Sequence, residues 1–227
     1  MATNAPAADR QHGGDIETKF PLQHVVPPPI VATPTVANPG PLGLCGFALT
    51  TFTLGLHNAG IGISPTESHD VVLGLAIIYG GLVQLLAGMW EFKTGNTFGA
   101  TAFCSYGAYW MSYGLISLPA MGLAATYSSM EAFNRSLGYF MLSWTIFTGL
   151  MLVGSHRSSI GLVSLFFFLF LTYVMTTASL LNNSVSAQIA SGAFGMTAAI
   201  IAWYNALSGL LTKDSSYFLL PVGRIGH

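Results

Sequence analysis

The sequence predicts an all-α integral membrane protein with six transmembrane helices, and three observations support this prediction. Of the 227 residues, 52% are hydrophobic and only 7% are charged, whereas about 25% of the residues in an ordinary soluble domain are charged. Six apolar runs are each close to the ~20 residues that a helix needs to cross a bilayer. The breaks between these runs are short and hold most of the charges that follow residue 37, so consecutive helices are expected to be antiparallel.

The first segment, residues 1–37, differs in composition from the rest. It is rich in proline and carries five of the fifteen Asp, Glu, Lys and Arg residues. Such a composition predicts a disordered tail. The segment lacks the continuous apolar region and cleavage site of a signal peptide, so we expect it to remain on the mature protein.

The predicted transmembrane domain covers residues 38–212. Its spans are expected at about 41–60, 71–92, 98–119, 136–154, 160–181 and 190–211. Small residues recur at four-residue spacing, as in Gly55 and Ala59, which lets helices approach closely in lipid. Residues 213–227 are predicted to form a short C-terminal tail.

The orientation follows from the distribution of Lys and Arg, which accumulate on the cytoplasmic side of membrane proteins. Arg135 is the only such residue in the first, third and fifth breaks. The other six lie in the two terminal segments and the second and fourth breaks, namely Arg10, Lys19, Lys93, Arg157, Lys213 and Arg224. Both termini are therefore predicted to be cytoplasmic.

Composition and motifs exclude several functions. The net charge of -1 offers no basic field for a nucleic acid. The sequence contains no hydrolase, zinc-protease or nucleotide-binding motif and no Cys/His cluster at metal-ligand spacing. We therefore expect no enzyme activity, no metal and no cofactor.

Neutral polar residues form stripes on several predicted helices. Thr50, Thr53 and His57 share one face of the first span, and Phe47, Thr51 and Asn58 share the adjoining face. Thr97, Thr101 and Ser105 follow at steps of four in the third span, and one side of the fifth span carries Leu169, Thr172, Thr176, Ser179 and Asn183. Ser and Thr in membrane helices also bond their own i−4 carbonyls, so single residues are ambiguous. Together the stripes predict a path for a small, lightly charged solute.

Two ionisable residues within the spans are candidate proton relays, Glu91 and His57. Glu91 follows Gln84 by seven residues on the second span. The alternatives are an interfacial ion pair of Glu91 with Lys93 and a hydrogen-bonded packing role for His57.

The run Asn38-Pro39-Gly40-Pro41-Leu42-Gly43-Leu44 predicts a helix start, because Asn is a favoured cap and proline is tolerated in a first turn. The free N–H groups and partial positive charge of a helix N-terminus suit an anion such as a carboxylate. This segment is therefore the strongest candidate for a carboxylate contact.

The sequence resembles the acetate uptake transporter family, which includes bacterial succinate-acetate permeases and fungal acetate transporters. The resemblance extends from residue 38 to the C-terminus and is most specific up to about residue 110. It is carried by residues 38–44, Gly46-Phe47, Leu56-His57-Asn58, Tyr79-Gly-Gly81, Gln84, Ala87-Gly88, Glu91, Gly95-Asn96-Thr-Phe-Gly99, Thr101-Ala-Phe103 and Ser105-Tyr106-Gly107. Two features depart from the usual pattern, Gly40 in place of alanine and the long tail, which resembles the fungal branch.

The resemblance implies six helices and a pore in each protomer, and a ring of six protomers. It also implies an apolar constriction formed by Phe47, Tyr106 and Leu169, with the register of Leu169 open to a slip within residues 165–171. Tyr106 is expected to add one hydroxyl donor there. The substrate path is expected along Asn38, Pro39, Leu42, Gly43, Thr50, Thr51, Gln84, Asn96, Thr97, Thr101, Ser105 and Thr172.

We therefore expect passage of acetate or a similar short monocarboxylate across the plasma membrane, with succinate as a further candidate. Whether the protein is a channel or a proton-coupled carrier stays open. One alternative is a membrane sensor of acid or acetate that signals through residues 1–37. Another is a channel for water or a neutral solute, since Asn38-Pro-Gly resembles the aquaporin Asn-Pro-Ala motif, although aquaporins carry that motif twice and it occurs once here.

Overall fold

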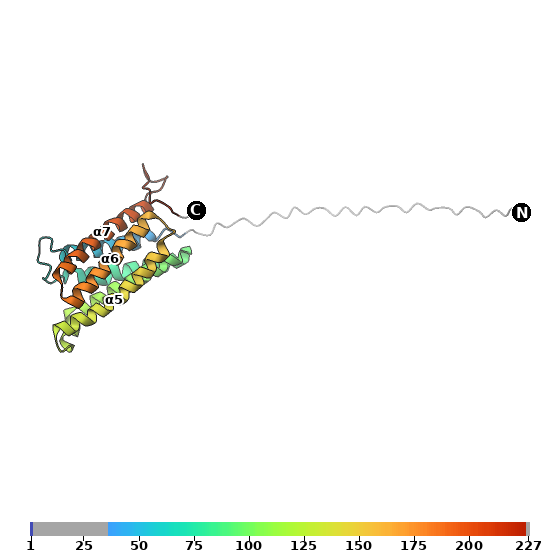
Figure 1. Ribbon diagram of the computed structural model, residues 1–227. Coiled ribbons are helices and arrows are strands. Elements are labelled where there is room, and N and C mark those ends of the chain that lie inside the picture. The colour runs from blue at the N-terminus through green and yellow to red at the C-terminus, as the bar shows by residue number, and fades with distance from the viewer. Residues whose placement is uncertain (2–35, 226–227) are drawn as a thin grey trace. The chain divides into compact units, whose positions relative to one another are not determined.

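The computed structural model describes Met1 and residues 36–225, and every regular element in this part is helical. Nearly all of the predicted N-terminal tail and the last two residues lie outside the described residues. Figure 1 shows the helices. Their bounds are α1 Gly40–Asn58, α2 Val71–Ile77, η1 Ile78–Val83, α3 Gln84–Thr94, α4 Thr97–Ser117, η2 Pro119–Met121, η3 Leu123–Thr126, α5 Met130–Ser155, α6 Ile160–Asn182 and α7 Val185–Leu210.

Four helical stretches of the described chain are long and apolar enough to cross a membrane. They are Val71–Thr94, Met130–Ser155, Ile160–Asn182 and Val185–Leu210. Helices α1 and α4 do not reach this level of hydropathy, because α1 is rich in Thr and Gly and α4 in Gly, Ser and Tyr. The prediction of a membrane protein is supported. Length and hydropathy identify four of the six predicted spans.

Side-chain caps set the starts of the later helices. The hydroxyl of Ser129 accepts a hydrogen bond from Ala132 N at 3.1 Å, and Ser184 does the same for Ala187 N at 3.3 Å. These caps satisfy backbone donors that the first turn leaves free. As a result α5 begins six residues and α7 five residues before the apolar runs predicted at 136 and 190. Hydropathy alone did not reveal these polar first turns.

Helices α1 and α7 pack antiparallel at close range. At one end, Gly209 lies against Pro41 at the start of α1. At the other end, Gly192 faces the backbone of Gly55 and Ala59, so closely that a Cβ at position 192 would stand 2.7 Å from Gly55 O. The predicted close approach at Gly55 and Ala59 is therefore present between these two helices.

The second predicted span is one helical run from Val71 to Thr94 that contains a π-helical segment, η1. The sequence predicted a regular helix here. Gly80 and Gly81 are buried in the segment, and a Cβ at Gly46 of α1 would meet Tyr79 O at 2.7 Å. Gly80 faces Thr50 of α1 and Gly81 faces Met111 of α4, so the widened turn packs closely against both helices. Such turns frequently occur at functional sites.

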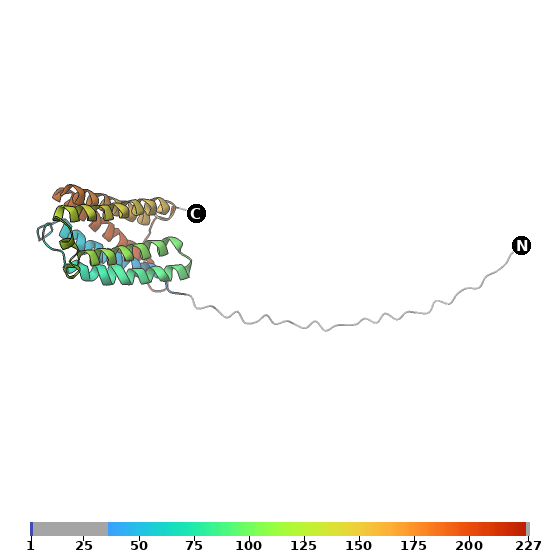
Figure 2. The ribbon, with the colours of Figure 1, turned by 90° about the horizontal axis from the view of Figure 1, so that it is seen from below.

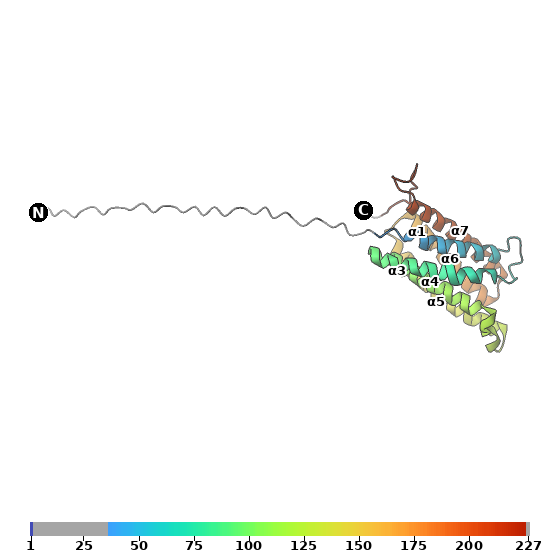
Figure 3. The same ribbon diagram turned by 180° about the vertical axis from the view of Figure 1, so that it is seen from behind.

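Two groups of helices face each other. Figure 1 shows α5, α6 and α7 in front, and Figure 3, from behind, shows α1, α3 and α4 nearest the viewer. Figure 2 separates the yellow and orange helices from the teal and green ones. The C-terminal segment crosses the start of α6, where Gly223 and Val222 carbonyls accept from Ile160 N and Gly161 N at 2.8 and 3.1 Å.

Candidate functional site

Two cavities lie between the helices and meet at one pair of side chains. The first, of about 720 Å³, is lined by Pro65–Asp70 of the loop between α1 and α2 and by α1, α4, α5, α6 and α7; we call it the loop cavity. The second, of about 510 Å³, includes Asn38, Glu91 and Arg157 in its lining; we call it the terminal cavity. Phe47 and Leu169 line both cavities. The path between the two ends of the bundle therefore narrows at these residues.

The three predicted constriction residues come together at this point from α1, α4 and α6. Phe47, Tyr106 and Leu169 are each less than 5% exposed and all line the terminal cavity. The ring centroids of Phe47 and Tyr106 are 6.3 Å apart. The Tyr106 hydroxyl, expected as a donor at the constriction, donates to Thr148 Oγ1 at 2.9 Å. This bond fixes the ring to α5.

The loop cavity has one unsatisfied polar group close to the constriction. Thr51 lies one turn after Phe47 on α1 and lines this cavity, and its buried Oγ1 has no hydrogen-bond partner within the described chain. Thr172 also lines the cavity, but its hydroxyl donates to Phe168 O at 2.8 Å. Because buried polar atoms are normally bonded, the unpaired Thr51 hydroxyl is an exception beside the constriction.

The terminal cavity has a matching group on the other side of the constriction. Gln84 at the start of α3 is 1% exposed, and its Oε1 has no partner among residues 36–225. Asn38 also lines this cavity and accepts from Gly40 N at 3.0 Å, so its oxygen caps the start of α1. Thr51 and Gln84 thus place one unsatisfied oxygen on each side of Phe47.

Glu91 lines the terminal cavity and is bonded to neutral groups. Its Oε2 accepts from Asn96 Nδ2 at 2.8 Å and from Thr94 Oγ1 at 3.3 Å. Asn96 in turn accepts from Gly99 N at 3.0 Å and caps α4. Lys93 is exposed, and the described residues show no ion pair between it and Glu91, so the alternative of an interfacial ion pair is not what forms here.

Several predicted path residues do not line either cavity. Thr50 bonds Gly46 O and packs against Gly80, and Gly43 packs against Phe103. The others are Pro39, Leu42, Thr97, Thr101 and Ser105, of which Leu42, Thr97 and Thr101 are exposed. Spacing groups residues on one helical face but does not determine what that face meets.

Sequence reasoning missed several titratable or charged residues of the cavities, including Glu67 and Asp70 of the loop cavity. Arg157 lines the terminal cavity, and His69 lines the loop cavity. Both lie in breaks between helices, where no periodicity marks them. The candidate relay His57 lines neither cavity, and its buried Nδ1 has no partner in the described part of the chain.

The described residues contain no group of three or more His, Cys, Asp or Glu side chains that could hold a metal ion. The polar atoms that line the cavities are hydroxyls, amides and scattered charges. Such a lining suits transient contacts with a small solute.

Comparison with known proteins places these cavities in a wider context. The family model described as the GPR1/FUN34/yaaH family matches residues 24–226. The chain is 43% identical to Ammonia transport outward protein 2 of Saccharomyces cerevisiae over 188 residues, which is 81% of this chain. It is 42% identical to Acetate permease A of Emericella nidulans over 197 residues, which is 82% of this chain. The matches span 65% of the length of each of these two relatives.

One solved structure matches over its whole length. The structure of the bacterial acetate channel SatP is 33% identical, superposes with a TM-score of 0.74, and covers 83% of this chain and 100% of that chain.

Proposed function

The chain belongs to the GPR1/FUN34/yaaH family, and from this premise we propose that it carries acetate or a similar short monocarboxylate across a membrane. The observation that carries the proposal is that two cavities meet at Phe47 and Leu169. The names of the Emericella permease and the bacterial channel support the same substrate. These names denote transport, in agreement with the expectation that the chain is not an enzyme.

The proposed path runs through an apolar gap between two polar groups. Phe47, Tyr106 and Leu169 exclude hydrated ions, because stripping the water from a charge without compensation costs several kcal/mol or more. The protonated acid crosses at a lower cost. Thr51 and Gln84 each offer an oxygen at the edge of the gap, and the hydroxyl of the acid can donate to either.

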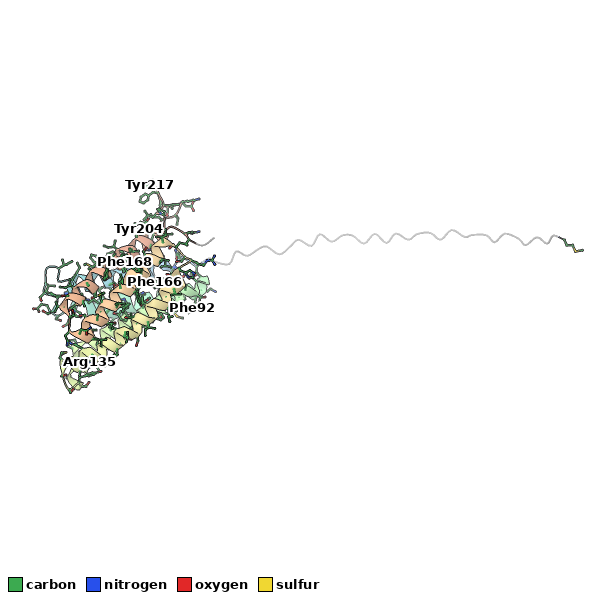
Figure 4. All side chains as sticks on the ribbon, in the orientation of Figure 1. Phe92, Arg135, Phe166, Phe168, Tyr204 and Tyr217 are labelled. Atoms are coloured by element: carbon green, nitrogen blue, oxygen red, sulfur yellow. The ribbon has the colours of Figure 1, made fainter. Side chains whose placement is uncertain are left out.

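The topology is part of the proposal. Helices α1 and α4 cross the membrane with the four more apolar stretches, which makes six spans in the plasma membrane. Figure 4 places Arg135 and Phe92 at opposite ends of the bundle. Since Lys93 adjoins Phe92 and since Lys and Arg favour the cytoplasmic side, the loop cavity opens outward and both termini are cytoplasmic. Assembly into a homo-hexamer rests on the family resemblance, and cross-linking in native membranes tests it.

The direct test is uptake of radiolabelled acetate by proteoliposomes, with and without a pH gradient, compared with empty vesicles. We expect protein-dependent uptake that an inward proton gradient increases, since the acid crosses with its proton. Competition by lactate and succinate ranks the substrates. No uptake above that of empty vesicles contradicts the proposal.

Thr51→Val is expected to raise the KM for acetate by about twofold to tenfold, because a neutral hydrogen bond contributes about 1 ± 0.5 kcal/mol. The substitution preserves shape and removes only the unsatisfied hydroxyl beside Phe47. Thr53→Val is the matched control, since the Thr53 hydroxyl is exposed and donates to Leu49 O at 2.9 Å. Equal KM values for the two variants contradict a solute contact at Thr51.

A second candidate is transport of ammonia or ammonium, which the name of the yeast relative suggests. The cavity linings favour it in one respect, because they include the carboxylates of Glu67, Asp70 and Glu91 and a single Lys or Arg side chain, Arg157. Uptake of labelled methylammonium by the same vesicles distinguishes the two. Methylammonium flux without acetate flux favours this candidate.

A further inference from the structure

The loop between α1 and α2 places an imidazole in the wall of the loop cavity. His69 Nε2 lies 2.8 Å from the Tyr113 hydroxyl of α4. Its ring also lies near that of His57 of α1, with the centroids 6.5 Å apart. Neither the polar stripes nor the proposed constriction assigns a role to His69.

The loop that carries His69 is held at two places. Gln188 of α7 donates from Nε2 to Pro65 O at 2.6 Å, and the His69–Tyr113 contact fastens the other end to α4. Both side chains line the loop cavity. The imidazole therefore has a fixed position beside the route of the solute.

The hydrogen bonds of His69 indicate which nitrogen takes up a proton. The backbone of Glu67 favours the charged imidazole. We assign the Nδ1–H tautomer to the neutral ring, since Nε2 meets the Tyr113 hydroxyl. In the neutral ring Nε2 then accepts from the Tyr113 hydroxyl, and it is the atom at which a proton is gained or lost.

Four titratable groups surround this imidazole: His57 from α1, Tyr113 from α4, and Glu67 and Asp70 from the loop itself. Gln188 from α7 is neutral. Burial lowers the pKa of His69 below its ordinary value of 6.5, the neighbouring His57 lowers it further, and Asp70 raises it. His69 is therefore neutral at neutral pH and gains its proton at a lower pH than a free imidazole does.

We propose that His69 is the proton-exchange residue of the loop cavity and that it protonates the entering carboxylate before the acid reaches Phe47. This proposal rests on the proposed carboxylate transport. Because Nε2 meets the Tyr113 hydroxyl, the imidazolium passes its Nε2 proton to that oxygen and Tyr113, which also lines the cavity, gives its own proton to the carboxylate. One N–H bond breaks and one O–H bond forms on the acid, so that one cation and one anion become a neutral imidazole and a neutral acid. A hydronium ion from the outer solution then returns a proton by the same route.

The energetics favour such an exchange. Reference pKa values are about 6.5 for an imidazole and about 4 for a carboxyl group, so in water the imidazole keeps the proton. Burial disfavours the charged form of both groups, which lowers the pKa of the imidazole and raises that of the carboxylate. In the cavity the two values approach each other, and proton transfer becomes nearly balanced.

The test is the rate of acetate exchange across proteoliposomes with equal pH on both sides, between about pH 5.5 and pH 8 at fixed total acetate. If the protein carries only those acid molecules that are already protonated in bulk water, the exchange rate falls about tenfold per pH unit over this range. With His69 as donor, we expect the wild-type rate to level off where His69 is protonated and to fall above that point. The pH profile of His69→Gln should have no level region, and its exchange rate in mildly acidic solution should be at least about tenfold lower than that of wild type. His156→Gln, at an exposed imidazole outside both cavities, should keep the wild-type profile.

Two further variants test the assignment without removing the imidazole. His57→Gln should move the midpoint of the profile to higher pH, and Asp70→Asn should move it to lower pH, because these neighbours lower and raise the pKa of His69. A His69→Gln profile identical to wild type overturns the inference and leaves the transport proposal intact. Unshifted midpoints in both neighbour variants also overturn it. Absence of acetate exchange in the wild type instead overturns the proposed function.

Discussion

Phe47→Ala is expected to raise acetate flux and to admit larger acids such as butyrate. Phe47 is 4% exposed and shares with Leu169 the wall between the two cavities. Steric discrimination of one methylene in an apolar pocket amounts to about tenfold or more. Removal of the ring should therefore raise the ratio of butyrate to acetate flux by at least about tenfold, measured with labelled acids in proteoliposomes.

Phe92→Ala is the matched control for this change. Phe92 lies on α3, is 55% exposed, and lines neither cavity. The same loss of a ring there should leave the flux ratio unchanged. If the ratio for Phe47→Ala equals that of the control while the protein remains folded, Phe47 does not limit the path.

Gly192→Ala is expected to destabilise the fold strongly. A Cβ at this position would stand 2.7 Å from Gly55 O and 2.9 Å from Asn58 C, and it would meet Ala59 N still more closely. All three atoms belong to the α1 backbone, so no side chain can rotate away. Overpacking typically costs 1–3 kcal/mol, and we expect a value toward the upper end, seen as a lower midpoint of thermal unfolding in detergent.

Gly74→Ala provides the opposite result with the same substitution. Nothing lies within 4 Å of a Cβ at this position in α2. Alanine within a helix is favoured over glycine by roughly 0.5–1 kcal/mol, so this variant should unfold at the same or a higher temperature. A midpoint for Gly192→Ala as high as that for Gly74→Ala contradicts the close contact of α1 with α7.

The family was predictable because its motifs are local. The run from Asn38 to Leu44 and the group around Asn96 identify it without knowledge of any contact, and the match over residues 24–226 confirms it. The helices were predictable from long apolar runs, except for their capped starts at Ser129 and Ser184. The π-helical segment was not predictable, since it depends on the packing of Gly80 against α1 and of Gly81 against α4.

The candidate site was predictable only in part. Asn96 is a motif residue and an expected path residue, but its bond to Glu91 depends on the turn between α3 and α4. Thr50 and Thr51 lie on adjoining faces of the first span, and both were expected along the substrate path. In the folded chain Thr51 faces the loop cavity with its hydroxyl unsatisfied, while Thr50 bonds Gly46 O.

The sequence by itself determined an all-helical membrane protein and its family, because hydropathy and motif identity are properties of short stretches of chain. Only the tertiary structure decided that two cavities meet at Phe47 and Leu169, that the Tyr106 hydroxyl is bonded to Thr148, and that His69 lies in the wall of the loop cavity. These facts depend on how helices distant in sequence rotate and cross. Helical spacing fixes which residues share a face, and packing alone fixes what that face meets.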